Sequence, residues 1–530
     1  MALQQVREGL QILHENLGIT EKELFNSKIC SIAKRLITVL GKIVPIYRTQ
    51  NLPAQIKDKF TPYEVARFFT NIAKQSSRGG PFQEFAINLE EYNKSVLDIK
   101  AALLAQNDGK AIDWRPRNAF LFSWCRVLIE ETGHPALQEA DAQSKESLFD
   151  TLTSFVMPLT QADDVADYLQ DKELLRFFTE AFKTSSYTAF LEKDHSAQIA
   201  SLERKSPACV PFFKLYLRLF KEGMAQFEKL VGTPALSDAW PQISQAWEKV
   251  MLCLQRSVTI NESLGTIQKD LDRKEEELAQ NMLMSFFKVL ERCYINAKGI
   301  QNSLTAQAPS ESETMFAGGE MVGHAANHIA TFEREIRARD FSNTIVWILA
   351  DLISSQQQLT HTEFSQLCKD LEVDSGIELP DDIRTFPELL EFSRTLGDRV
   401  LTQALEIVAS STATDKKSRF EERFRTCSSH LEVATIVSDI YGDDSGNEEK
   451  IIKIQQDAQQ RQAISELILR LSQNPSTNAH ETYLRRFNNG VQKLSRLSNS
   501  MPKSVVEHAN RYLEGVYRLA AMYMLLKTSI

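Results

Sequence analysis

The sequence predicts an all-α protein, either a multi-helix bundle or an irregular array of helical pairs with two to three packed units. Apolar residues recur at three- and four-residue spacing along most of the chain, which places them on one face of a helix. The 530 residues include only 20 glycines and 16 prolines, which leaves little room for glycine-rich loops. No run of alternating apolar and polar residues predicts a β-hairpin.

The chain is long enough to form more than one hydrophobic core, because single cores stop growing at about 250–300 residues. Hydrophobic residues make up 43% and charged residues 25% of the sequence, as in an ordinary globular protein. The helical patterns and their interruptions divide the chain into four parts. We expect an N-terminal helical unit at 1–138, a middle helical unit ending in a long helix at 146–300, a linker or mobile loop at 301–323, and a C-terminal helical unit at 324–530.

Five helices are expected in the N-terminal unit. Thr20 and Glu23 have the spacing of a capping box, in which each side chain bonds the backbone of the other. Thr61 precedes Pro62, and a hydroxyl followed by proline is typical of a helix start. The apolar stripes and these starts predict helices over 3–17, 20–44, 62–75, 85–106 and 116–132.

The middle unit is expected to hold five more helices, over 147–156, 164–187, 211–231, 240–256 and 261–298. Prolines 158, 207, 234 and 241 are expected in the loops, because proline cannot donate a hydrogen bond within a helix. The last range is the longest predicted helix.

The segment 302–323 is the longest stretch without helical periodicity, and it contains the pair Gly318 and Gly319. Glycine and serine punctuation of this kind is typical of a linker. Helical spacing then resumes and predicts helices over 324–339, 344–357, 362–371, 386–409, 418–440, 448–471, 482–498 and 502–527.

Charge and cysteine usage restrict the class of protein. The net charge of −9 argues against a nucleic-acid binder, which needs a clustered positive surface. The seven cysteines are odd in number and dispersed in apolar segments, which favours free thiols in a reducing compartment. No apolar run reaches the length of about 20 residues that spans a membrane, and no signal peptide is evident. We expect a cytoplasmic protein, or one delivered into a cytosol without a cleavable signal peptide, with no transmembrane segment.

Common catalytic motifs are absent from the sequence. It contains no phosphate-binding loop of the Walker type, no dinucleotide-binding glycine motif, no nucleophile elbow and no Cys-x-x-Cys pair. The kinase, Rossmann, hydrolase and zinc-ribbon classes are therefore disfavoured, and no cofactor is expected other than a divalent metal.

Glu320, His324 and His328 form the candidate metal site. They are four residues apart, so they share one face if the helix begins by Glu320. Two histidines and a carboxylate are ligands that zinc accepts. The pattern lacks the general-base glutamate of the His-Glu-x-x-His motif, so ordinary surface or interhelical histidines are the alternative.

Two groups of residues are candidates for binding partners. Trp114, Arg115 and Arg117 form an aromatic and basic cluster in an expected loop, and exposed tryptophan and arginine are common at interface hot spots. Arg485 and Arg486 lie in a basic stretch near the C-terminus that suits an acidic protein or an anionic headgroup. The alternatives are a tryptophan that packs at a helix junction and a solvated helix face.

Taken together, these patterns favour a non-enzymatic helical protein that binds other proteins through helical faces or grooves, as an adaptor, tether or secreted effector. One alternative is a helical metal-dependent enzyme with a site around His324 and His328, assisted by Glu320 or Glu335. Another is a peripheral membrane protein that uses its C-terminal basic helices. Protein partners are expected, and nucleic acid is not. The partner, the oligomeric state and a rod-like or compact arrangement stay open.

Overall fold

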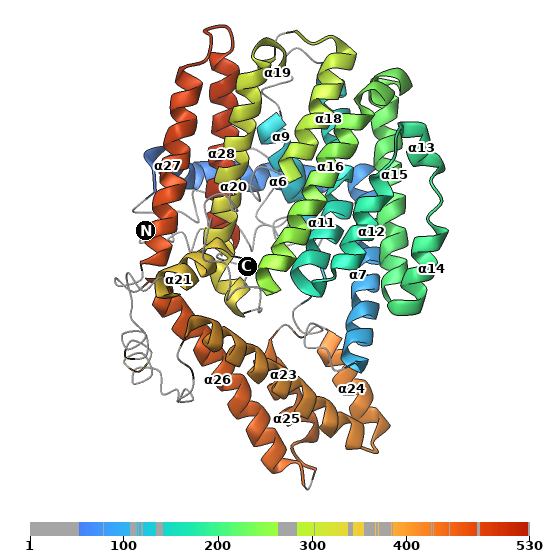
Figure 1. Ribbon diagram of the computed structural model, residues 1–530, viewed down its shortest axis with the longest axis vertical. Coiled ribbons are helices and arrows are strands. Elements are labelled where there is room, and N and C mark those ends of the chain that lie inside the picture. Colours follow the sequence, from blue (N-terminus) through green and yellow to red (C-terminus); the bar gives the residue numbers. More distant parts are fainter. Residues whose placement is uncertain are drawn as a thin grey trace, which may run out of the picture.

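The computed structural model of the chain is all-helical, which confirms the predicted fold class. Helices make up 87% of the structure, and about 20 of them pack together (Figure 1). No strand occurs among the described residues, which are 52–77, 79–106, 114, 116–117, 120–133, 141–262, 283–301, 303–337, 343–354, 366, 369, 383, 385–425, 427, 429–444, 446–473 and 478–527. The helices expected over 3–17 and 20–44 lie outside these residues.

The described part of the first half of the chain is almost entirely helical. They are α5 (Ala54–Lys57), the 3-10 turn η1 (Asp58–Phe60), α6 (Pro62–Ser77), α7 (Pro81–Ala105), α9 (Phe120–Gly133), α10 (Ala142–Ser154), α11 (Val156–Asp164), the π-helical turn η3 (Val165–Leu169), α12 (Lys172–Phe182), α13 (Tyr187–Glu192), α14 (Ser196–Lys205), α15 (Cys209–Val231) and α16 (Thr233–Glu262).

The second half begins with α18, since residues 263–282 of the expected long helix lie outside the described part. Its helices are α18 (Leu283–Lys298), α19 (Leu304–Gln307), α20 (Pro309–Arg337), α21 (Thr344–Ser354), α23 (Phe386–Ser410), α24 (Thr414–Arg425), α25 (His430–Tyr441), α26 (Glu448–Gln473), α27 (Ala479–Asn499) and α28 (Val506–Lys527). The helix expected over 362–371 lies almost entirely outside the described residues.

Side-chain caps explain several helix starts. The backbone N–H of Glu64 donates to Thr61 Oγ1 at 3.2 Å, and α6 begins at Pro62 as predicted. Asp171 accepts from two backbone N–H groups at the start of α12. Thr385 and Glu388 form a capping box at the start of α23. Each cap satisfies donors that the first helical turn leaves without a partner.

Two of the expected helices are in fact interrupted. The range 164–187 breaks at Gln170, whose left-handed φ of 52° ends η3 before Asp171 caps the next helix. The range 418–440 breaks between α24 and α25, where the Ser429 hydroxyl accepts from the Glu432 N–H. In both places a polar side chain near the break starts a new helix, and the periodicity across the break is too regular to reveal it.

The linker expected over 301–323 is wrong. Residues 304–307 form α19, and α20 runs without a break from Pro309 to Arg337 through Gly318, Gly319 and Gly323. The boundary expected at residue 324 therefore falls inside one helix. Pro241 likewise lies within α16 instead of in a loop, and Pro234 lies in the first turn of the same helix, where its missing N–H leaves no helical bond unmade.

The buried side chains form three hydrophobic cores. The aromatic core joins helices from α7 to α18, with buried residues between Phe82 and Ile300. The terminal core joins α5, α6 and α9 to α20, α21, α27 and α28, so it brings residues 52–128 against residues 304–524. The arm core lies between Val400 and Ala458. Because α9 contributes to both large cores, the expected separate units at 1–138 and 146–300 are wrong.

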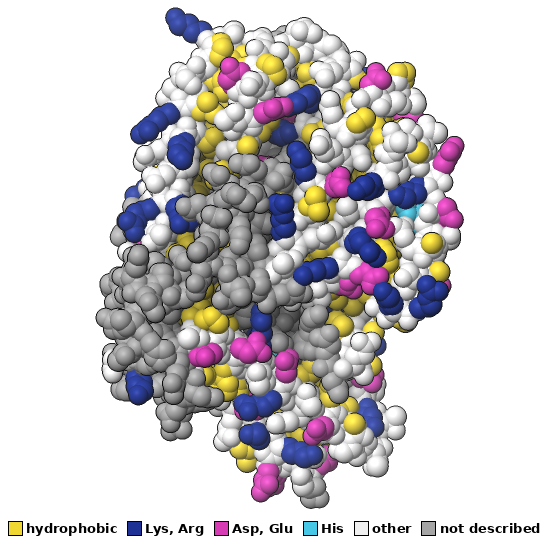
Figure 2. All heavy atoms as spheres, viewed as in Figure 1, with side chains coloured by type: hydrophobic (Ala, Val, Ile, Leu, Met, Phe, Trp, Pro, Cys, Tyr) yellow, Lys and Arg dark blue, Asp and Glu magenta, His cyan; other side chains and the backbone are white. Residues whose placement is uncertain are grey.

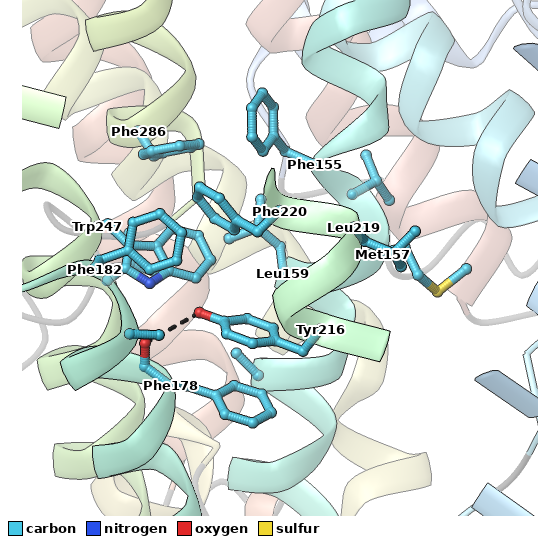
Figure 3. Close-up of a cluster of buried hydrophobic side chains, with 14 of the residues drawn as sticks. Phe155, Met157, Leu159, Phe178, Phe182, Tyr216, Leu219, Phe220, Trp247 and Phe286 are labelled. Atoms are coloured by element: carbon cyan, nitrogen blue, oxygen red, sulfur yellow. Dashed lines mark hydrogen bonds between the residues drawn. The ribbon is translucent and has the colours of Figure 1, made fainter. Parts of the chain in front are cut away.

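The aromatic core is filled by interlocking rings. Phe220 of α15 lies 3.7 Å from Phe182 and 4.6 Å from Trp247 between ring centroids, and Trp247 lies 5.2 Å from Phe286 (Figure 3). Tyr216 donates a hydrogen bond to the Phe178 carbonyl at 3.2 Å, so its hydroxyl is satisfied inside the core. Such rings bury large apolar areas with defined mutual angles.

In the terminal core the helices approach one another at glycines. A methyl group at Gly318 would lie 2.5 Å from a Leu494 side-chain carbon, and one at Gly319 would collide with the Tyr512 hydroxyl. On α28, a methyl group at Gly515 would collide with the backbone carbonyl of Glu131 on α9. The glycines that suggested a linker are therefore contact points for α27 and α28.

An arm that contains parts of α23 and α26 together with α24 and α25 extends from the body. The first part of α23 and the last part of α26 lie in the terminal core, while their other ends pack with α24 and α25 in the arm core. Figure 1 shows this arm below the upright helices of the body. The end of α7 contacts it, because Lys100 Nζ donates to the Cys427 carbonyl at 3.2 Å and Leu103 packs against the arm core.

Candidate functional site

The predicted histidines lie side by side inside the terminal core. His324 and His328 are one turn apart on α20, with ring centroids 4.0 Å apart. Only 8% of His324 and 9% of His328 is exposed, and Glu320, one turn earlier, is also buried. The helical continuity through Gly318 and Gly319 is what places all three on one face.

Residues at the start of α21 hold His328. The Thr344 backbone N–H donates to His328 Nδ1 at 3.1 Å, and the Thr344 hydroxyl lies 2.8 Å from the same nitrogen. Asn343 bridges back to α20, because its side-chain amide donates to the His328 carbonyl at 2.9 Å and to Glu335 Oε2 at 2.8 Å. A nitrogen that accepts from a backbone N–H carries no proton, so the His328 ring is held in its neutral form with hydrogen on Nε2.

Burial keeps His324 neutral as well. It lowers the pKa of His324 well below its usual value of 6.5, and the neighbouring His328 lowers it further, while Glu335 acts in the opposite direction. Two neutral imidazoles in contact are therefore available at this point of the core.

A metal site at the two histidines needs a third ligand, and the described residues do not supply one. Among the described residues, no group of three or more His, Cys, Asp or Glu side chains has an arrangement that would hold a metal ion. The predicted pairing of His324 with His328 is present, but Glu320 does not complete a ligand set with them. Metal binding at Glu320, His324 and His328 stays a prediction from sequence.

A buried ion pair lies further along the same helical interface. Lys288 of α18 donates to Glu291 at 2.8 Å and to the Thr132 carbonyl at 3.2 Å, and its ammonium group lies 4.7 Å from the Phe316 ring centroid. Burial raises the pKa of Glu291 despite the attraction of Lys288. Burial also raises the pKa of Tyr512 well above its usual value. These groups join the aromatic and terminal cores.

Trp114 is not an exposed binding residue. Its side chain is fully buried, with its ring against Tyr168 and Phe212, and its N–H donates to Asp164 Oδ2 at 3.3 Å. Arg117 forms an ion pair with the same carboxylate. The expected interface cluster is therefore wrong for Trp114, because a buried carboxylate binds both the indole and the guanidinium. Arg115 lies outside the described residues.

Tyr92 of α7 completes the surroundings of Asp164, since its hydroxyl also donates to that carboxylate. Asp164 has no exposed surface, so three donors from two distant segments replace its water. No sequence signal marks this cluster, because its members are separated by up to 72 residues and share no motif. Asn343 and Thr344 likewise share no sequence motif with His328.

The two C-terminal arginines differ in exposure. Arg485 is exposed on α27, with a bond from its guanidinium to Thr482 Oγ1 at 3.3 Å, while Arg486 is half-buried. They are adjacent in sequence, so they point in different directions from the helix. Only Arg485 is on the outer face of the molecule.

Comparisons of the chain with protein families, with curated proteins and with solved structures find no match. None of the described helices combines the length and apolar composition required to cross a lipid bilayer.

Proposed function

We propose that this chain is a protein-interaction protein of the adaptor, tether or effector type, and that the arm carries its docking surface. The supporting observation is the outer face of α26. Between Ile452 and Ala463 this helix exposes Ile452, Lys453, Gln456, Gln459 and Gln462. Lys453 is the single charged member of this set, which we call the α26 face.

The α26 face has one charged residue among its five exposed residues, on a chain in which 25% of residues are charged. Two other charged residues of the same stretch are turned inward, since Asp457 and Arg461 are buried and Asp457 pairs with Arg399 at 3.2 Å. Interface centres are depleted in charged residues, because burying an unpaired charge against a partner is costly. Ile452, of which 52% is exposed, supplies an apolar anchor at one end of the face.

The arm also places the start of α26 beyond the body. Its tip has its own core, and Figure 1 shows α24, α25 and the start of α26 beyond the ends of the body helices. A partner helix could lie along α26 through contacts at three- and four-residue spacing, the mode by which a helix docks onto another.

The test is a quantitative pull-down with the wild-type chain and two matched variants. Ile452→Glu alters the α26 face, and Ile87→Glu makes the same change on α7, where 66% of Ile87 is exposed. We expect a partner that the wild-type chain and Ile87→Glu retain and that Ile452→Glu binds at least about tenfold more weakly.

Two results would contradict the proposal. One is a wild-type chain that recovers no protein above the bead background while it converts a small molecule. The other is equal loss of the partner by both variants, which would remove the α26 face as the docking surface.

A further inference from the structure

A stretch of the sequence that contains basic residues and no acidic ones coincides with a helix at the edge of the body. Residues 482–506 contain no aspartate or glutamate, although the chain as a whole has a net charge of −9. The same residues include Arg485, Arg486, Lys493, Arg496 and Lys503. They form α27 and the turn that leads to α28.

The fold separates this helix into two faces. The inner face packs into the terminal core through Tyr483, Leu484, Phe487, Val491 and Leu494. Arg485, Lys493 and Arg496 are exposed on the outer face, and Lys503 is exposed in the following turn. Arg485 and Arg496 are about three helical turns apart and so point the same way, with Lys493 one turn before Arg496. We call these four residues the α27 face; Figure 2 shows Lys and Arg side chains along the edge that α27 forms in Figure 1.

The charges of the α27 face are not neutralised within the described chain. Arg485 bonds the neutral Thr482 hydroxyl, and none of the four residues takes part in an ion pair among the described residues. The next helix differs, because Arg511 pairs with Glu507, and Arg518 pairs with Glu64, Glu131 and Glu514. Arg518 of α28 is thus held in ion pairs with α6 and α9, while the basic groups of the α27 face are directed at solvent.

We propose that the α27 face is a contact site for an anionic lipid surface. A flat surface with many negative headgroups can meet separated basic groups along a convex edge helix without a matching pocket, and each basic group adds to the attraction. A protein partner would need an apolar anchor at the centre of the contact. None of the large apolar side chains exposed on the described chain, Ile87, Leu191, Leu252, Leu431 and Ile452, lies on α27.

The net negative charge of the chain gives this contact an orientation. Screening limits electrostatic attraction to about 10 Å at about 0.1 M salt, so the headgroups experience the nearest face and not the whole molecule. With the α27 face toward the surface, the groups nearest the headgroups are basic. The proposal goes beyond protein docking at the α26 face, which lies on a different helix and is tested independently.

The experiment is co-sedimentation of the full chain with vesicles of phosphatidylcholine, with and without phosphatidylserine. We expect binding to the anionic vesicles at about 0.1 M salt and release at about 1 M, where the screening length falls to about 3 Å. Replacing Arg485, Lys493 and Arg496 by glutamine should lower the partition coefficient about 100-fold, at about fivefold for each charge removed.

The matched control changes the same net charge elsewhere. Arg204, Lys214 and Lys229 are exposed on α14 and α15, and their replacement by glutamine should leave most of the binding. Thermal unfolding of each variant checks the fold, and Lys493→Gln alone, with an expected fivefold loss, provides a milder variant should the triple change unfold the protein.

The proposal is overturned if the wild-type chain does not distinguish the two kinds of vesicle, if binding persists at about 1 M salt, or if the control loses as much as the α27 variant. Binding to immobilised polyglutamate in the same salt range, with no binding to either vesicle, would assign the α27 face to an acidic protein and would equally overturn a lipid contact.

Discussion

The aromatic core and the terminal core solve the same packing problem in opposite ways. The aromatic core fills the space between helices with rings, such as Phe182 and Phe220 at 3.7 Å between centroids. The terminal core instead has glycines at its helix contacts, so that α28 lies close to α9 at Gly515 and to α20 at Gly319. The first core should therefore be sensitive to lost volume, and the second to added volume.

The two cores also differ in how the chain builds them. The aromatic core draws on residues 82–300, whereas the terminal core joins 52–128 to 304–524 and encloses polar groups at His324, His328 and Glu335. Contacts between segments so distant in sequence form only after a large loss of chain entropy. Four changes test this comparison.

The largest effect is expected for Phe220→Ala in the aromatic core. Phe220 is 1% exposed and lies against six other rings, so its removal leaves a cavity that the surrounding rings cannot fill. The free energy of unfolding should fall by about 4 kcal/mol. Urea denaturation measures it, with Leu252→Ala at a 42% exposed position as the control. A loss no larger than that of the control would mean that the rings are not close-packed.

Gly515→Ala should have the next largest effect, although it adds only one methyl group. That group would collide with the Glu131 carbonyl, whose carbon it would approach at 2.9 Å, and backbone atoms cannot move aside as a side chain can. We expect a loss of about 2 kcal/mol in the free energy of unfolding. Gly490→Ala is the control, because its methyl group would meet only Val322 at 3.7 Å.

That control should be neutral or stabilising by up to about 1 kcal/mol, since alanine restricts the unfolded chain more than glycine does. Equal effects of the two alanine substitutions would remove the distinction between the cores, because close approach of α28 to α9 would then have no energetic weight.

Tyr216→Phe should cost about 1 kcal/mol, because it removes one buried hydrogen bond and no packing. The lost bond is the one from the Tyr216 hydroxyl to the Phe178 carbonyl. Thermal unfolding of Tyr216→Phe beside Phe220→Ala separates the polar from the packing contribution within the aromatic core. A larger loss for Tyr216→Phe than for Phe220→Ala would reverse the proposed order.

The smallest change is expected for the nearly isosteric Glu291→Gln, and it should appear as a slope with pH. Burial raises the pKa of Glu291 above its usual 4.5, so the folded chain holds this proton more tightly than the unfolded chain. The contribution of Glu291 to stability is present below pH 4.5 and is lost as the pH rises through its folded pKa. Glu291→Gln should therefore gain stability relative to the wild-type chain as the pH rises. A relative loss over that range would show that Lys288 outweighs burial.

Much of the helical architecture could be predicted from sequence, because amphipathic spacing and caps are local. The expected range 386–409 agrees with α23, and 448–471 agrees with α26, to within two residues at each end. The failures were also local in origin. The pair Gly318 and Gly319 predicted a linker, because glycine occurs both in flexible segments and where two helices come into close contact. These two cases differ only in which side chains lie opposite the glycines.

The candidate sites could be predicted only in part. One helical turn fixes the proximity of His324 and His328, and that much follows from their spacing. Burial of Trp114 depends on Asp164, and the neutral state of His328 depends on Thr344, and no local pattern links the members of either pair. The metal ligands, the interface arginines and the partner class stay predictions for that reason.

The sequence by itself determined that the chain is helical and where many of its helices begin, because hydrogen bonds within a helix connect residues four apart. Only the tertiary structure decided that two large cores share α9, that glycines of α20 and α28 are contact points, and that the basic residues of α27 face outward. Those outcomes depend on which helices pack together, and the free energy of that packing comes from side chains that are hundreds of residues apart in the sequence.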